Sequence, residues 1–336
     1  MNKFGVVVIG RNEGDRLLNC LKTLKRQLPD HFPIVYVDSG SSDGSLEAAE
    51  SLGIHAISLD PSMPFTMARG RNSGFEYLTT KYNLAYIQFI DGDCELVDGW
   101  LERAVETFKE HDQSLAIVCG RRRERFPEAS IYNKLIDLEW KKPIGEVQSC
   151  GGDSLVKVTA IKEVGGFNSS LICGEEPELC IRLRRRGWKI LSIDADMTLH
   201  DADIKAFSQW WRRLTRSGWA GAQGMDLYGA PPERYKVQEC FKCWLWGPIL
   251  LSFSIILCFL VSPYSIFLLL IYPLQMFRYY QKIAEYDMST LDKIHGSFLF
   301  VLIKFPHAVG QVMYFVSKLR NTPLSLIEYK SSSKDC

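Results

Sequence analysis

The stretch at residues 4–14, FGVVVIGRNEG, decides the fold class because a short β-branched run ends in a polar turn. Such a run is typical of a buried strand in a parallel sheet. Leucines then follow at helical spacing, at Leu17, Leu18, Leu21 and Leu24. The order of strand, polar loop and helix recurs from residues 33–45, PIVYVDSGSSDGS, and from residues 85–93, AYIQFIDGD, with a helix expected at 100–111. This alternation predicts an α/β domain whose mostly parallel sheet is flanked by helices.

The composition narrows the class of protein. The chain has 336 residues, enough for two average domains, and its 40 Lys and Arg nearly balance its 39 Asp and Glu. We expect no nucleic-acid partner, since domains that bind nucleic acids usually carry a clear basic excess. A charged fraction of 24% and a hydrophobic fraction of 46% exclude a disordered chain. Ten irregularly spaced cysteines, and an N-terminal apolar run too short for a signal-peptide core, predict reduced, cytosolic thiols.

A long uncharged segment sets the last third of the chain apart. Residues 244–277 contain no Asp, Glu, Lys, Arg or His, which is typical of membrane segments. A straight helix of this length would measure about 51 Å, but Ser262-Pro263 divides it into two pieces, each marginal for spanning a core of roughly 30 Å. Basic residues flank both ends, at Lys236, Lys242, Arg278 and Lys282. The positive-inside rule therefore predicts a hairpin entered from the cytoplasmic face, either two tight spans or a re-entrant pair.

A further apolar stretch at residues 296–316 is less suited to crossing a membrane. Lys304, Pro306 and His307 lie in its middle, where a charge is costly. We therefore expect this stretch to lie in the membrane interface or to pack on the hairpin. Together these patterns predict a soluble domain at residues 1–225 and a membrane-associated helical region at residues 226–336. A buried helical pair in a soluble oligomer is the alternative.

Polar clusters follow three of the predicted strands, where ligands bind in open α/β sheets. They lie at residues 11–13, 38–43 and 91–93. In the last cluster, Asp91 and Asp93 could present carboxylate oxygens to one Mg²⁺ or Mn²⁺ that bridges to a diphosphate, although a solvated turn has the same pattern. His200 follows the strand-like run ILSIDADMTL and could be a third ligand or a purely structural residue.

Three other clusters have both a chemical and a structural interpretation. Glu175 and Glu176 stand at the head of a basic helix, where a carboxylate could cap the helix or deprotonate a hydroxyl group. Gly151 and Gly152 could allow a ligand to approach the backbone closely, or could form a plain turn. The arginines within residues 121–125, RRRER, could bind phosphate or cover a solvated face.

In this order the motifs resemble those of family 2 glycosyltransferases with the GT-A fold, over residues 3–225. VVVIGRNE and VDSGSSDGS resemble the family's strand-end motifs for the nucleotide. ARGRNSG resembles its donor-side helix start, and FIDGD its metal-binding D-x-D motif. CGGDSLVK resembles its acceptor-side loop, and GEEPELCIRLRRRGWKI the motif that holds the catalytic base.

The resemblance implies an inverting transfer of a sugar from a nucleotide donor, most often a UDP-sugar, to a lipid-linked or cell-surface glycan acceptor. It implies that the donor is bound by Arg11, Glu13, Asp38, Arg71, Asp91, Gly151 and Gly152. It implies that Mg²⁺ or Mn²⁺ is held by Asp91, Asp93 and His200. Glu176 occupies the position of the catalytic base, where the family usually has Asp, and Glu175 stays the second candidate for that role.

Other enzyme classes lack their own motifs in this chain. The G-x-G-T-R opening of sugar nucleotidyltransferases is absent. The turn after the first strand is G-R-N-E-G, not the G-x-G-x-x-G of dinucleotide oxidoreductases. A transporter or membrane scaffold would explain the apolar region but leave the acidic motifs without a role. The remaining alternative is a membrane-anchored protein that binds or hydrolyses sugar nucleotides without transferring the sugar.

Overall fold

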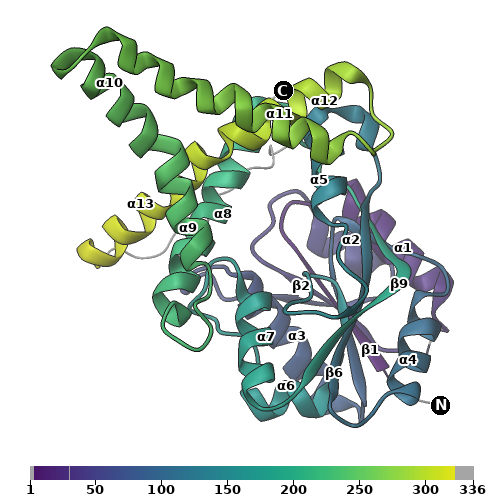
Figure 1. Cartoon of the computed structure of the whole chain (residues 1–336). Coiled ribbons are helices and arrows are strands. Elements are labelled where there is room, and N and C mark those ends of the chain that lie inside the picture. Colours follow the sequence, from purple (N-terminus) through teal and green to yellow (C-terminus); the bar gives the residue numbers. More distant parts are fainter. Residues whose placement is uncertain (1–3, 30, 322–336) are drawn as a thin grey trace. The chain divides into compact units, whose positions relative to one another are not determined.

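The structure is a computed structural model that describes residues 4–29 and 31–321 (Figure 1). The chain divides into two compact units. The first comprises the chain up to Glu128 together with Ile136–Asp203, and the second comprises Ala129–Leu135 together with the chain from Ile204 onward. Helix α5 (Ile131–Glu139) therefore contributes residues to both units.

The first unit is built on a mixed sheet that has nine strands within the described residues. These are β1 (Phe4–Gly10), β2 (Ile34–Asp38), β3 (His55–Ser58), β4 (Tyr86–Asp91), β5 (Cys94–Leu96), β6 (Leu115–Glu124), β7 (Gly145–Glu146), β8 (Ser154–Lys157) and β9 (Lys189–His200). Their order is β3-β2-β1-β4-β8-β6-β9-β5, and β7 pairs with β9. The α/β fold expected from the alternating pattern is therefore confirmed.

The sheet is less parallel than the sequence predicts. Strands β3, β2, β1 and β4 are parallel to one another, as are β6 and β9. Strand β8 runs antiparallel to both β4 and β6, and β5 and β7 run antiparallel to β9. Strand β8 follows β7 after residues 147–153, with no helical crossover between the two strands, so its direction is not constrained to be parallel.

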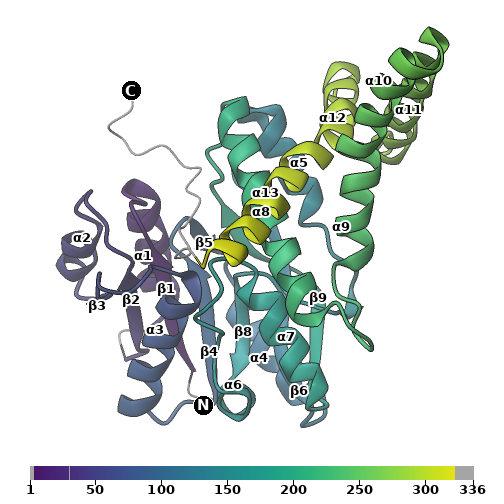
Figure 2. The same cartoon turned by 90° about the vertical axis from the view of Figure 1, so that its left-hand side faces the viewer.

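Helices cover both faces of this sheet. They are α1 (Asp15–Gln27), α2 (Ser45–Ser51), α3 (Met67–Lys81), α4 (Trp100–Glu110), α6 (Val158–Val164) and α7 (Glu175–Arg185), with a 3₁₀ turn, η1 (Pro127–Ala129), before α5. Helices α3 and α6 lie on one face and α1 and α4 on the other (Figures 1 and 2). As the spacing of the leucines predicts, Leu17, Leu21 and Leu24 of α1 are buried.

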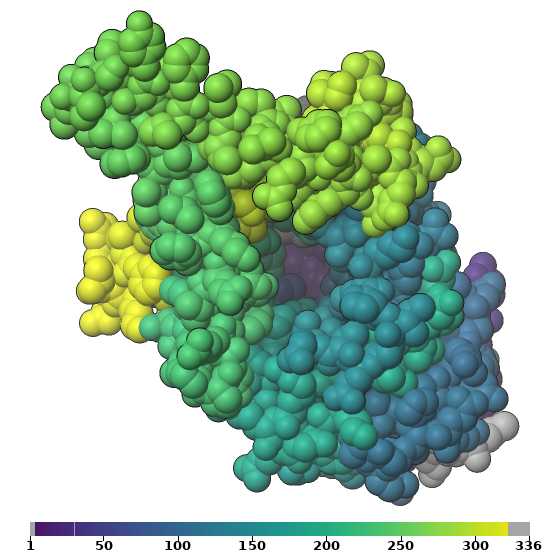
Figure 3. Space-filling view, viewed as in Figure 1, coloured from purple at the N-terminus to yellow at the C-terminus, as the bar shows by residue number. Residues whose placement is uncertain are grey.

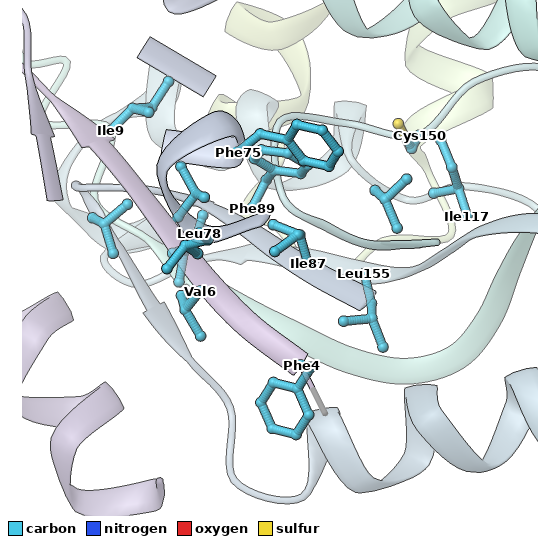
Figure 4. Close-up of a cluster of buried hydrophobic side chains, with 14 of the residues drawn as sticks. Phe4, Val6, Ile9, Phe75, Leu78, Ile87, Phe89, Ile117, Cys150 and Leu155 are labelled. Carbon is cyan, nitrogen blue, oxygen red and sulfur yellow. The ribbon is translucent and has the colours of Figure 1, made fainter. Parts of the chain in front are cut away.

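The hydrophobic core of the first unit packs around β1, which lies between β2 and β4 in the sheet. Val6, Val7 and Val8 are fully buried. Side chains from β1, α3, β4 and β8 gather in one apolar cluster (Figure 4). Helix α3 can approach β1 closely because Gly74 has no side chain. A Cβ added to Gly74 would lie only 2.5 Å from Val7 Cγ1. Burial of these β-branched side chains on both faces fixes the strand ends that carry the polar loops.

The second unit is helical. Its elements are α8 (Phe207–Tyr228), α9 (Val237–Trp244), the π-helical turn η2 (Leu245–Ile249), α10 (Leu250–Leu260), the 3₁₀ segment η3 (Pro263–Leu270), α11 (Ile271–Ile283), α12 (Thr290–Leu302) and α13 (Lys304–Arg320). Helices α8 and α13 pack closely at two glycines, since a Cβ on Gly218 would meet His307 O at 2.2 Å and a Cβ on Gly310 would meet Thr215 O at 1.9 Å.

The predicted break at Ser262-Pro263 lies between α10 and η3, so the hairpin turns where the sequence places it. Its outer end, green in Figure 3, exposes large apolar side chains that include Phe259, Leu260 and Tyr264, at 86%, 78% and 77% of their surface. Among the described residues two helices are long and apolar enough to cross a membrane, by length and composition only: Val237–Leu260 and Thr290–Arg320. The second contains the stretch 296–316, whose interfacial position stays a prediction.

Candidate active site

The first two predicted strand-end loops are joined by hydrogen bonds. Asn12 N donates to Ser41 Oγ at 2.9 Å, and Ser42 N donates to Asn12 Oδ1 at 2.8 Å. The guanidinium carbon of Arg11 lies 5.3 Å from the centre of the Phe65 ring. The register of β1 and β2 brings Gly10 opposite Asp38, so these loops leave the sheet at the same edge.

Asp38 is buried at this edge, and both of its carboxylate oxygens accept hydrogen bonds. Tyr36 Oη donates to Oδ1 at 2.8 Å, while the backbone N–H groups of Gly40 and Ser41 donate to Oδ2 at 2.9 and 2.8 Å. Burial, followed by the nearby Asp38 carboxylate, raises the pKa of Tyr36, which keeps its hydroxyl group a donor. Asp38 therefore fixes the shape of the loop, and its remaining lone pairs are what a ligand could use.

The acidic turn after β4 contacts the first loop. Gly92 N donates to Ile9 O at 2.7 Å, and a Cβ on Gly92 would lie 3.5 Å from Glu13 Cγ. Glu13 in turn forms an ion pair with Arg16, with 3.1 Å between Oε2 and Nε. Glu13 therefore lies beside the D-x-D turn, as expected for residues at neighbouring strand ends.

Asp91, the first acid of this turn, is held by two arginines. Its Oδ1 lies 2.8 Å from Nη2 of Arg71, and its Oδ2 lies 2.8 Å from Nη2 of Arg122. Burial would raise the pKa of Asp91, but the two guanidinium groups hold it below its ordinary value. Asp91 is thus an ionised carboxylate, and each of its two oxygens contacts the guanidinium group of an arginine.

Arg122 continues the network to a second buried carboxylate. Its Nε donates to Asp153 Oδ2 at 2.8 Å, and its Nη2 lies 2.7 Å from Asp153 Oδ1, so the pair is bidentate. Thr198 Oγ1 also donates to Asp153 at 2.6 Å, and Asp153 Oδ1 accepts from the backbone N–H of Asp91. These hydrogen bonds fix the orientation of the Asp91 carboxylate.

Arg71 carries the network to the head of α7. It is 1% exposed, donates to Glu175 through Nη1 and places Nη2 3.2 Å from Glu176 Oε1. Glu175 is fully buried, whereas the side chain of Glu176 is 15% exposed. Gly174 caps the helix in the left-handed region, at φ 80°, which turns the chain so that both acids reach Arg71. Only Glu176 has surface that an acceptor could contact.

The glycine loop before β8 passes directly over this network. A Cβ on Gly152 would lie 2.6 Å from Asp91 Oδ2 and 2.8 Å from Arg71 Nη2. A Cβ on Gly151 would meet nothing closer than Lys142 Nζ, at 3.4 Å. Close approach therefore requires a glycine at position 152, whereas position 151 has room for a side chain.

Asp93 and His200 form a separate pair. His200 Nε2 lies 3.2 Å from Asp93 Oδ2, and its Nδ1 lies 3.2 Å from Glu124 Oε2. Burial lowers the pKa of His200, but the carboxylates of Asp93 and Glu124 outweigh it and raise the pKa. Trp140 packs edge-on against the imidazole, with 4.5 Å between ring centres. The ring is thereby held with Nε2 facing Asp93.

These residues fit a hard divalent cation. A carboxylate and an imidazole whose second nitrogen is paired with another carboxylate form a common metal-binding arrangement. In the described part of the chain, Asp93, Cys94 and His200 form one group that could hold an ion, and Asp91, Cys94 and Asp153 form another. Cys94 is a poor ligand for Mg²⁺ or Mn²⁺, because burial, aided by the nearby acids, raises the pKa of its thiol.

The structure thus joins most of the predicted site residues but distributes them over two centres. Asp93 and His200 lie together, while both oxygens of Asp91 face arginines. Residues that sequence reasoning missed are Arg122 as a partner of Asp91, Asp153, Glu124, Trp140 and Thr198. A period of two along β6 could have indicated Arg122, whose side chain is 15% exposed while those of Arg121 and Arg123 are 35% and 45% exposed.

Comparison with known proteins identifies the domain. Residues 5–157 match the model of glycosyl transferase family 2. The match covers a little under half of the chain, and over these residues the chain resembles a family 2 glycosyltransferase domain. The chain is 24% identical over 252 residues to the glycosyltransferase AglE of Haloferax volcanii, which covers 72% of this chain and 78% of that protein. The predicted enzyme class, glycosyltransferase, is confirmed.

Two further matches agree with this assignment. The succinoglycan biosynthesis protein ExoA of Rhizobium meliloti is 24% identical over 218 residues, covering 62% of this chain and 66% of that protein. Among solved structures, the mannosyltransferase PcManGT of Pyrobaculum calidifontis, in complex with GDP-Man and Mn²⁺, superposes with a TM-score of 0.61 at 14% identity. That match covers 92% of this chain and 87% of PcManGT, and it confirms the GT-A fold.

Proposed function

We propose that the chain is a metal-dependent, inverting glycosyltransferase that moves a sugar from a nucleoside diphosphate donor, with UDP the favoured nucleotide, to a lipid-linked or cell-surface glycan. The observation that carries the proposal is Arg71, which contacts Asp91 of the D-x-D turn as well as Glu175 and Glu176. One buried side chain thereby joins the acidic turn expected to face the donor and the acids expected to face the acceptor.

Glu176 is the proposed general base. Its side chain is partly exposed, whereas Glu175 is fully buried against Arg71. Glu176 would take the proton of an acceptor hydroxyl group as the oxygen forms a bond to the anomeric carbon. The bond from that carbon to the diphosphate breaks in the same displacement, and the nucleoside diphosphate leaves with its electron pair. A single displacement inverts the anomeric centre and needs no covalent glycosyl-enzyme.

Asp93 and His200 are the residues proposed to hold Mg²⁺ or Mn²⁺, with Asp91 as the third member of the set. A divalent cation bound there would supply charge neutralisation for the diphosphate leaving group. Glu124 holds His200 by its Nδ1, so that Nε2 is directed toward Asp93. That the structural neighbour PcManGT was solved with Mn²⁺ supports a divalent cation in this domain as well.

The nucleotide is proposed to lie across the ends of β1 and β2. Arg11, Glu13 and Asp38 come from the two joined loops described above. The diphosphate and the sugar would lie next to Arg71 and the loop at Gly151 and Gly152, because these residues lie beside Asp91. The arginine supplies positive charge and the glycine loop lets the donor approach the backbone.

We further propose that residues 1–225 are the catalytic domain and that residues 226–336 hold the enzyme on the cytoplasmic face of a membrane. The exposed apolar end of the hairpin and the two long apolar helices support membrane association. Basic residues at the base of both hairpin legs support the cytoplasmic orientation. An enzyme held at this face of the membrane would have direct access to a lipid-linked acceptor in the same membrane.

The test is a panel of nucleotide sugars presented to the full-length protein in membranes with Mn²⁺, with release of the nucleoside diphosphate as the readout. We expect one donor to be used, in a reaction accelerated by a lipid extract and lost with Glu176→Gln. Release that is unaffected by any acceptor and by Glu176→Gln would instead identify a hydrolase. Absence of release with every donor would contradict the proposed transfer.

A further inference from the structure

A hollow opens between the two legs of the hairpin in the second unit, and we call it the hairpin hollow. One leg contributes Lys242 and Trp246, and the other contributes residues of α11 between Ile271 and Lys282. Its cavity volume is about 190 Å³. The legs are tied at one end of the hollow, where Tyr272 Oη donates to Gly247 O at 3.2 Å.

The walls of the hollow change from apolar to cationic along its length. On α11 the lining residues Ile271, Leu274, Arg278 and Lys282 are three or four positions apart and so lie on one helix face. The apolar pair is nearest the Gly247–Tyr272 contact, and the cationic pair follows. On the opposite, antiparallel leg, Trp246 adjoins that contact and Lys242 lies one turn farther from it.

A fourth cation comes from the joint between α12 and α13. Lys304 lines the hollow, and a Cβ on Gly247 would lie 3.2 Å from the Cβ of Lys304, so the base of this side chain packs on the first leg. Its long stem allows the ammonium group to reach the hollow while the methylene groups cover apolar surface. A lysine between two apolar helices is costly unless its charge meets water or an anion.

Within the part of the chain that the structure describes, these four cations have no acidic partner. The lining contains no Asp or Glu. Lys242, Arg278, Lys282 and Lys304 form no ion pair with any carboxylate in residues 4–29 and 31–321. Like charges that converge on one hollow repel each other, so an anion bound among them would relieve this repulsion. The base of the hairpin is therefore built to receive negative charge.

We propose that the hairpin hollow binds a membrane lipid with a phosphate monoester or diphosphate headgroup. The headgroup would lie among Arg278, Lys282 and Lys242, where the planar guanidinium group can contact two phosphate oxygens. The hydrocarbon chain would run along Ile271, Leu274 and Trp246 toward the exposed apolar end of the hairpin. A monoester carries about −1.5 to −2 charges, so it matches four cations better than a singly charged phosphodiester lipid does.

This inference rests on the proposed membrane association but not on any glycosyl transfer, and a binding assay without donor keeps the two apart. Full-length protein in detergent is titrated with farnesyl monophosphate, with a short-chain phosphatidylglycerol and with inorganic phosphate, and each dissociation constant is measured. We expect farnesyl monophosphate to bind at least about tenfold more tightly than either of the others, because only it combines a doubly charged headgroup with an apolar chain.

Variants then locate the site. Arg278→Gln with Lys282→Gln should weaken farnesyl monophosphate at least about tenfold. The matched control, Lys22→Gln with Arg320→Gln, removes the same charge from residues that do not line the hollow, and it should bind within about twofold of wild type. Arg278→Lys, which keeps the charge but not the planar fork, should lie between the two and guards against a misfolded double variant.

The outcomes are distinct. If the two double variants bind farnesyl monophosphate equally weakly, or if both bind it as tightly as wild type, the assigned site is wrong. Phosphatidylglycerol or inorganic phosphate bound as tightly as farnesyl monophosphate overturns the assigned ligand class. Nucleoside diphosphate release is measured on the same samples. If the proposed transfer is wrong, no release is seen, and the lipid titration still tests the binding site independently.

Discussion

Replacing Gly152 by alanine is the most direct test of the charge network around Asp91. The added Cβ would lie 2.6 Å from Asp91 Oδ2, 2.8 Å from Arg71 Nη2 and 3.1 Å from Arg122 Nη2. Ordinary contacts of a Cβ begin near 3.4 Å, so the methyl group overlaps the carboxylate by about 0.8 Å. The carboxylate cannot simply rotate away, because an arginine holds each of its oxygens.

The size of the effect follows from this crowding. Overpacking of a buried site costs about 1–3 kcal/mol. For a unit of this size, a loss of 1 kcal/mol lowers the melting temperature by about 2–4 °C, so Gly152→Ala should lower it by about 2–12 °C. The activity should fall further, by about 10² or more, since a displacement of 1 Å in a positioning group can cost that much.

Gly151→Ala is the matched control, since it adds the same methyl group one residue earlier. Its Cβ would meet only the flexible end of Lys142, at 3.4 Å, and neither glycine has a positive φ. We expect the control to keep most of the nucleoside diphosphate release and the melting temperature of wild type. If both variants behave alike, or if Gly152→Ala is as active as wild type, the close packing over Asp91 does not matter for the reaction.

The remaining predictions concern the base, the metal, the nucleotide and the membrane. Glu176→Gln should lower the rate by about 10² or more while donor binding survives, whereas a dead Glu175→Gln beside a normal Glu176→Gln would show that the base was misassigned. Asp93→Ala should abolish metal-dependent donor binding, and unchanged turnover with a chelator would refute a metal role. Asp38→Ala should raise the donor KM about tenfold with little change in kcat, because the loop loses its acceptor for two backbone N–H groups. Full-length protein should be extracted from the membrane fraction by detergent and not by high salt, and protein that is soluble without detergent would remove the anchor.

Much of the first unit could be predicted because its signals are local. The β-branched run at residues 4–9 forms strand β1, and α4 (Trp100–Glu110) matches the helix expected at 100–111. The antiparallel direction of β8 could not be predicted, because a four-residue strand carries no signal of its direction in its own sequence. Strand direction there depends on tertiary pairing with β4 and β6.

The candidate site was only partly accessible from the sequence for a similar reason. Motifs after β4 and at the start of α7 located Asp91, Asp93, Glu175 and Glu176, since each cluster follows a recognisable element. The partners of these acids come from distant strands. Arg122 is 31 residues from both Asp91 and Asp153, so their ion pairs arise from the sheet order and not from any local pattern.

The charge of the assembled network gives a physical reason to expect coupling between metal and donor. The carboxylates of this network contact two guanidinium groups, those of Arg71 and Arg122, and belong to Asp91, Asp153, Glu175 and Glu176. Within this set the carboxylates outnumber the guanidinium groups by two, and Asp93, which pairs with His200, lies close to Asp91. A donor diphosphate that approaches this edge of the sheet would be repelled by the excess, and the repulsion is strong because the groups are buried. A divalent cation at Asp93 and His200 would offset most of it, so we expect donor and metal each to bind more weakly without the other.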